Sequence, residues 1–99
     1  MAFKITWTDI ATEDFLEIVN YLETEWSERI SQNFIIDCYA KLDLLANTPM
    51  IGPSSNLYKN VRRILITKNI ALYYEVKKDE ITLVNFFDVR QSPERNLFE

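Results

Sequence analysis

The sequence predicts an α+β fold, in which an N-terminal strand and a helical hairpin pack on one face of a small antiparallel sheet. Three observations predict the order β-α-α-β-β-β. Apolar and polar residues alternate over residues 3–7, as in a half-buried strand. Apolar residues then recur at spacings of three and four through residues 9–47, and short strand-like runs follow from residue 61. A chain of 99 residues suffices for one core, so we expect a single domain spanning residues 1–99.

The N-terminal pattern predicts a strand followed by a helix. Alternation places Phe3, Ile5 and Trp7 on one face of the strand. Thr8 or Asp9 then offers a side-chain oxygen that can cap a helix of about residues 9–26. The apolar stripe of this helix consists of Ala11, Phe15, Ile18, Leu22 and Trp26, with Val19 beside it.

A second helix follows almost at once, which predicts a helical hairpin. Ser27 is its expected cap, and the helix should end near Asn47 because Thr48 precedes a proline. Its stripe consists of Ile30, Phe34, Cys38, Leu42 and Leu45, widened by Ile35 and Tyr39. On this stripe Cys38 is expected to be a small core residue.

A loop of residues 49–56 holds the only glycine and should connect the helices to three strands. We expect Met50 and Ile51 to pack under this loop. The strands are predicted at residues 61–67, 70–76 and 81–87, and the last is apolar on both faces, as in a central strand. The pattern leaves open which of them pairs with the first strand.

Alternation divides the residues of these strands between the two faces of the sheet. Ile70, Leu72, Tyr74 and Val76 should face the helices, and Ala71, Tyr73 and Glu75 the opposite, partly open face. Arg62 and Arg63 should lie on opposite faces, without a pattern to say which arginine faces which way.

Composition excludes several kinds of chemistry. Without histidine and with one cysteine, the chain cannot form a Cys/His zinc site, a Ser–His–Asp triad or an internal disulfide. One glycine cannot supply a glycine-rich phosphate loop. We therefore expect no cofactor and no metal. Neither a signal peptide nor an apolar run of about 18 residues is visible, so a cytoplasmic protein without membrane contact is expected.

The net charge of −4 conceals an uneven distribution. Residues 1–58 carry nine acidic and three basic side chains, whereas residues 59–99 carry six acidic and eight basic ones. Lys59, Arg62, Arg63 and Lys68 form a basic segment with no acid among them. An acidic helical half is thus joined to a mildly basic sheet half.

With its order of elements, the chain resembles the RelE/ParE superfamily of toxins from type II toxin–antitoxin systems, also called plasmid-stabilisation proteins. The matching stretches are Trp7-Thr8, Ala11, residues 14–22, Trp26, Leu45, residues 48–52, Val61-Arg62-Arg63, residues 72–76 and residues 86–93. The resemblance implies a small cytoplasmic bacterial toxin that inhibits growth and is wrapped and neutralised by a cognate antitoxin. It also implies an apolar groove between the helical hairpin and the sheet edge that the antitoxin covers, and a homodimer when the antitoxin is absent is a further expectation.

The superfamily has two known activities, and the residues bear on the choice between them. RelE-like members cut mRNA on the ribosome without a metal, and ParE-like members inhibit DNA gyrase. The family's tail arginine falls on Arg90, but Ala71 and Asp88 stand where nuclease-type members have arginine and histidine, and no tyrosine follows Tyr74. An acidic chain is also poorly suited to dense ribosomal phosphate. ParE-like inhibition of a protein target such as DNA gyrase is therefore the preferred interpretation.

The alternatives remain open at the level of sequence. One is a RelE-like, ribosome-dependent endoribonuclease, which would make the protein an enzyme. Another is a divergent inactive member or a generic protein-interaction module. For either toxin activity, the candidate residues of the target-binding or active site are Arg62, Arg63, Lys68, Tyr73 and Arg90.

Overall fold

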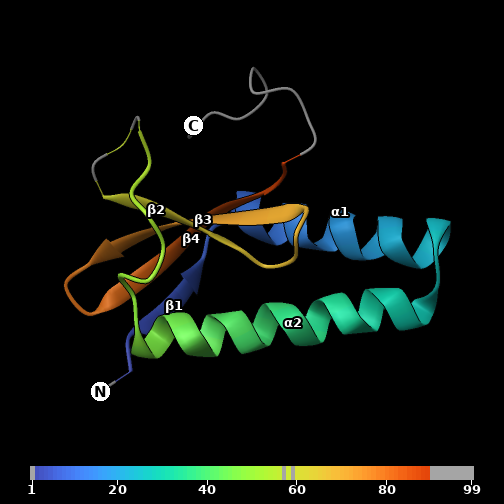
Figure 1. Ribbon diagram of the computed structural model, residues 1–99, viewed down its shortest axis with the longest axis horizontal. Coiled ribbons are helices and arrows are strands. Elements are labelled where there is room, and N and C mark those ends of the chain that lie inside the picture. Colours follow the sequence, from blue (N-terminus) through green and yellow to red (C-terminus); the bar gives the residue numbers. More distant parts are fainter. Residues whose placement is uncertain (1, 57, 59, 90–99) are drawn as a thin grey trace.

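Two helices cover one face of a four-stranded sheet (Figure 1). The computed structural model describes residues 2–56, 58 and 60–89. The elements are β1 (Lys4–Trp7), α1 (Asp9–Glu25), α2 (Glu28–Asn47), β2 (Val61–Leu65), β3 (Ile70–Lys77) and β4 (Glu80–Asp88). The predicted α+β class and the order of its elements are confirmed.

Side-chain caps fix where both helices begin. The Thr8 side chain accepts a hydrogen bond from the Ala11 N–H at 3.0 Å, and Ser27 accepts one from the Ile30 N–H at 3.1 Å. The second helix ends at Asn47, as the following Thr48-Pro49 predicts. The capping residues therefore predicted where both helices begin, and the proline predicted where α2 ends.

The sheet is mixed rather than wholly antiparallel, which corrects the expected strand directions. Its order is β1-β4-β3-β2; β3 pairs antiparallel with both neighbours, and β1 pairs parallel with β4. The whole helical hairpin and two strands separate β1 from β4, so no tight turn imposes an antiparallel pairing. Because β4 has a neighbour on each side, its apolar faces are those of a central strand, as predicted.

The core lies between the helices and the sheet. The predicted stripes supply Ala11, Phe34, Cys38, Leu42 and Leu45, all buried, and the sheet supplies Leu72, Tyr74, Ile81, Leu83 and Phe86. Burial raises the pKa of the Cys38 thiol to about 12, in keeping with its predicted role as a small core residue.

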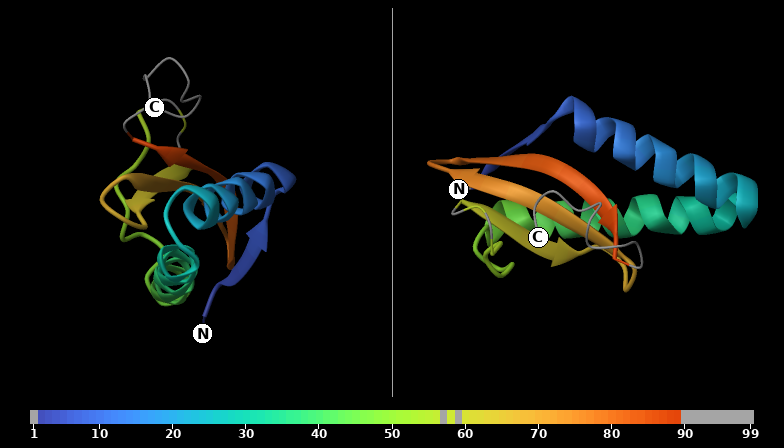
Figure 2. Two further views of the ribbon diagram at one scale, coloured as in Figure 1. Left: turned by 90° about the vertical axis from the view of Figure 1, so that its right-hand side faces the viewer. Right: turned by 90° about the horizontal axis from the view of Figure 1, so that it is seen from above.

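Three residues of the predicted stripes are exposed instead. Trp26 is 69% exposed, and Ile30 and Tyr39 are exposed too. The helical hairpin extends past the sheet at the end where α1 meets α2, which Figure 2 shows in its right-hand view. Trp26 and Ile30 flank the junction of the two helices, so the apolar stripe continues beyond the buried core.

The second face of the sheet carries a smaller apolar cluster. Val61, Ala71 and Tyr73 are buried there, with Val84 and Phe87 packed against them. Tyr73 is only 1% exposed, so the expectation that this face displays its ring was wrong. A bulge between Tyr73 and Tyr74 gives β4 an extra residue at this point and interrupts the regular alternation.

Candidate functional site

Tyr74 and Arg62 attach the loop of residues 49–53 to the sheet. The Tyr74 hydroxyl donates to the Pro49 carbonyl at 2.9 Å and accepts from the Gly52 N–H at 3.0 Å. The Arg62 guanidinium donates to the carbonyl oxygens of Gly52 at 2.6 Å and Met50 at 3.3 Å. Burial raises the pKa of the Tyr74 hydroxyl, against the opposing effects of the Gly52 hydrogen bond and Arg62.

Gly52 is required by this close approach. A Cβ atom on Gly52 would collide with the backbone oxygen of Arg63 and would lie 2.8 Å from the Tyr74 hydroxyl. A backbone oxygen cannot move aside as a flexible side chain can, so the loop needs glycine here. The loop exposes Met50 and Ile51, which corrects the expectation that both pack under it.

The structure separates the five candidate residues predicted from the sequence. Arg62 faces the loop of residues 49–53, whereas Arg63 lies directly across from the buried Tyr73 in the pairing of β2 with β3. The two arginines therefore lie on opposite faces, as alternation predicts. Lys68 is exposed in the connection between β2 and β3, and Arg90 lies outside the described residues.

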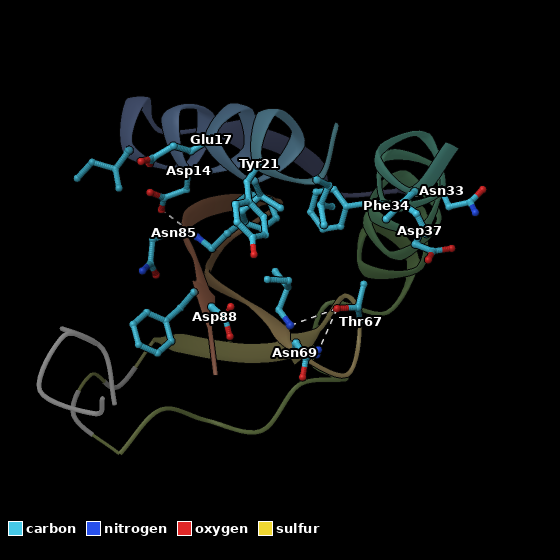
Figure 3. Close-up of a pocket in the computed structure, with 17 residues that line it drawn as sticks. Asp14, Glu17, Tyr21, Asn33, Phe34, Asp37, Thr67, Asn69, Asn85 and Asp88 are labelled. Carbon is cyan, nitrogen blue, oxygen red and sulfur yellow. Dashed lines mark hydrogen bonds between the residues drawn. The ribbon is translucent and has the colours of Figure 1, made fainter. Parts of the chain in front are cut away.

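A groove of about 840 Å³ lies between α1, the first half of α2, the start of β3 and the end of β4 (Figure 3). Side chains of α1 form one wall and side chains of α2 the other, with β4 and the β2–β3 connection completing it. The residues lining this groove are Ile10, Asp14, Glu17, Ile18, Tyr21, Leu22, Ile30, Asn33, Phe34, Asp37, Thr67, Asn69, Ile70, Asn85, Phe86, Phe87 and Asp88.

Asp14 connects the α1 wall of the groove to β4. Its Oδ2 accepts a hydrogen bond from the Phe86 N–H at 3.1 Å, drawn as a dashed line in Figure 3. Partial burial raises the pKa of the Asp14 carboxyl, and repulsion from Glu17 and Glu13 adds to this, while the Phe86 hydrogen bond opposes it. Among the residues that the structure describes, no basic side chain offsets the charge of the Asp14 carboxylate.

The groove combines an apolar floor with negative charge. Its described lining residues include four carboxylates and no lysine or arginine. In the part of the chain that the structure describes, no basic side chain forms an ion pair with Asp14, Glu17 or Asp37. The Oδ1 atom of Asn85 is buried and has no hydrogen-bond partner among the described residues. Such a groove can bind an apolar segment that brings hydrogen-bond donors and positive charge.

Over the described ranges, no group of three or more His, Cys, Asp or Glu side chains could hold a metal ion. Among the described residues, no helix is long and apolar enough to cross a membrane.

Sequence reasoning anticipated an apolar groove but not its acidic residues. A signal was present on α1, because Ile10, Asp14, Ile18 and Tyr21 share one edge of the helix at spacings of three and four. The Asp14 carboxylate lies between the apolar Ile10 and Ile18 on this edge, rather than on the polar outer face of the helix. The loop contacts of Tyr74 left no such signal, because they join residues far apart in the chain.

Two helices on one face of a four-stranded sheet form a fold that is also found in chains of solved toxin–antitoxin systems. The chain belongs to the ParE toxin family: the family described as "ParE toxin of type II toxin-antitoxin system, parDE" matches residues 5–93. The predicted membership of the RelE/ParE superfamily is confirmed.

Solved structures agree on the fold. A chain of the chromosomal ParDE system from P. aeruginosa matches with a TM-score of 0.74 at 17% identity, covering 89% of this chain and 97% of that one. The protein HP0894 from Helicobacter pylori matches at 0.61 and 19% identity, covering 90% and 97%. A chain of the E. coli DinJ–YafQ toxin–antitoxin complex matches at 0.62 and 12% identity, covering 89% and 93%. No curated protein sequence matches significantly.

Proposed function

We propose that this chain is the active toxin of a type II pair, that a cognate antitoxin neutralises it in the cytoplasm, and that it acts on a protein target such as DNA gyrase. The whole of residues 1–99 would form one toxin domain. The match of the ParE family over residues 5–93 carries this proposal. That match favours the ParE-like activity over the RelE-like one, although both kinds of toxin share the fold.

The positions of the candidate residues support a protein target. RNA cleavage needs a base, an acid and cations converging on one phosphate. Here Arg62 is engaged with loop carbonyls on one face, and Tyr73 is buried on the other beside Arg63. A residue set divided between two faces is a poor nuclease site, whereas a protein target can contact a wider surface.

Two assays run side by side test the target. We expect the purified toxin to inhibit supercoiling by DNA gyrase and to leave mRNA intact in a translation-coupled reaction. Arg63→Ala and Lys68→Ala should weaken the inhibition, whereas Lys4→Ala on β1 serves as the control. Because Arg62 holds the loop, a loss of inhibition in Arg62→Ala counts as a loss of target binding only if the variant unfolds at the same denaturant concentration as wild type.

Ribosome-dependent mRNA cleavage that is lost in Arg63→Ala or Lys68→Ala would instead establish the RelE-like activity. This second candidate function is retained because β2 and the connection after it carry basic side chains that could contact RNA phosphates. If induced expression without antitoxin leaves growth unaffected, the chain is not an active toxin, and both activities are rejected.

The antitoxin is proposed from the family and from the exposed apolar surface of the groove. Ile10, Tyr21 and Ile30 line the groove and are exposed. Such a concentration of exposed apolar side chains is typical of a surface that a partner covers. Co-expression with the protein encoded by the adjacent reading frame should restore growth and yield a complex on gel filtration.

A further inference from the structure

We propose that the groove binds a cationic amphipathic segment of the antitoxin, with lysine or arginine side chains on both flanks of an apolar stripe. This inference rests on the proposed function, because it assigns the chemistry of the partner. The negative charge, which in the sequence argued only against binding to nucleic acid, would here attract a positively charged protein segment.

The apolar floor sets the first property of the occupant. Ile18, Leu22, Phe34, Ile70 and Phe86 line the groove and belong to the main core or pack against it. These side chains are held in place by the core beneath them, so the floor is preformed. An occupant therefore needs an apolar stripe, such as the i, i+3, i+4, i+7 face of an amphipathic helix.

The walls set the second property. Asp14 and Glu17 project from α1, and Asp37 projects from α2 on the opposite wall (Figure 3). Both flanks of an apolar segment lying in the groove would thus face carboxylates. Positive side chains on both flanks complement this arrangement, whereas an acidic segment would meet like charge on each side.

The environment of Asp14 supports the same conclusion. Its carboxylate is partly desolvated and lies one turn from Glu17, with no compensating cation among the described residues. The carboxylate oxygens of the walls can only accept hydrogen bonds. A lysine or arginine from the partner would supply both the missing charge and the donors.

Two matched double variants test the role of the charge. Glu17→Lys with Asp37→Lys reverses one carboxylate on each wall. Glu23→Lys with Asp43→Lys makes the same charge change on the same two helices at exposed positions outside the groove. The probe is the full-length protein encoded by the adjacent reading frame, and its dissociation constant is measured by biolayer interferometry.

We expect the groove variant to bind about tenfold more weakly or worse, because cationic side chains would meet like charge on both walls. The Glu23→Lys/Asp43→Lys control should bind within about twofold of wild type, because 0.15 M salt screens charges that lie outside the groove. Equal loss in both variants, or no loss in either, overturns the inference. Thermal unfolding monitors folding, and the milder Glu17→Gln with Asp37→Asn should lose affinity in the same direction.

The two proposals fail in distinguishable ways. If the adjacent protein binds and restores growth, but the groove variants bind it as tightly as wild type, the groove inference alone is rejected. If that protein neither binds nor restores growth, both the neutralisation and the groove inference are rejected.

Discussion

At the scale of single residues, the Tyr74 hydroxyl links the loop to the sheet through two hydrogen bonds. Tyr74→Phe leaves the Gly52 N–H and the Pro49 carbonyl without this partner. We expect a loss of about 1–3 kcal/mol in the free energy of unfolding, since a buried group left unsatisfied carries its desolvation cost. Urea unfolding measures it. The exposed Tyr39→Phe is the control and should change stability by less than about 0.5 kcal/mol.

Asp14 gives the fold a pH dependence of identifiable sign. Its folded-state pKa lies above the ordinary value of 3.8, so the folded state favours the protonated carboxyl. Ionised Asp14 therefore destabilises the fold at pH 7, and this penalty disappears as the pH falls through the folded pKa towards 3.8. Asp14→Asn removes the charge and retains an oxygen that can accept from the Phe86 N–H.

We accordingly expect Asp14→Asn to be at least as stable as wild type at pH 7, with its advantage shrinking at pH values near 4. Urea unfolding at a series of pH values gives the difference between the two proteins. Glu23→Gln, at an exposed site outside the groove, should show no such trend. This account would be contradicted if the stability of Asp14→Asn minus that of wild type were smaller at pH 7 than at pH 4.

At the scale of elements, Thr8 joins α1 to the sheet. Its hydroxyl accepts from the Ala11 N–H at the start of the helix and donates to the Leu83 carbonyl of β4 at 2.8 Å. Ser27 caps α2 without such a contact to the sheet among its described hydrogen bonds. Thr8→Ala should therefore cost about 2 kcal/mol of unfolding free energy, and Ser27→Ala about 1 kcal/mol.

Chemical denaturation of the two cap variants checks this order. Thr8→Ser keeps the hydroxyl and should recover most of the loss. If Ser27→Ala is the more destabilising change, the bond to β4 contributes little, and Thr8 acts as a helix cap alone.

Local patterns predicted most of these elements. Capping residues and the proline after Thr48 set the helix limits, and the apolar faces of residues 81–87 identified the central strand. The parallel direction of β1 could not be predicted, because strand pairing over such a separation leaves no local pattern. For the same reason the Tyr74–Gly52 contact and the burial of Tyr73 emerged only from the folded structure. The helical spacing of Asp14 with its apolar neighbours hinted at one acidic wall of the groove, but the opposite wall on α2 depends on how the two helices pack.

At the scale of the whole molecule, the acidic and basic side chains lie on different parts of the fold. The acidic half of the sequence forms the helical hairpin, and the groove beside it collects carboxylates from both helices and from β4. The basic side chains Arg62, Arg63 and Lys68 belong to β2 and the connection that follows it. Under the proposed function, the antitoxin and the target would therefore meet chemically different surfaces.

The exposed groove also predicts how the free toxin should associate with itself. Two copies that meet through their grooves would bury apolar side chains such as Tyr21 and Ile30, but would bring acidic walls together. Salt screens this repulsion, since the Debye length falls to about 3 Å at 1 M. Self-association should therefore strengthen with salt, whereas binding of a cationic antitoxin segment should weaken.

Sedimentation velocity at on the order of 20 mM and 500 mM NaCl separates these responses. We expect the free toxin to shift from monomer towards dimer as salt increases, and Ile30→Glu to remain monomeric at both concentrations. Ile36→Glu is the matched control, because Ile36 is also exposed on α2 but lies outside the groove. Dimerisation that resists Ile30→Glu but is abolished by Ile36→Glu would move the self-association surface to the outer face of the hairpin. The groove would then stay unoccupied in the free toxin, so the antitoxin would bind it without first displacing a second copy.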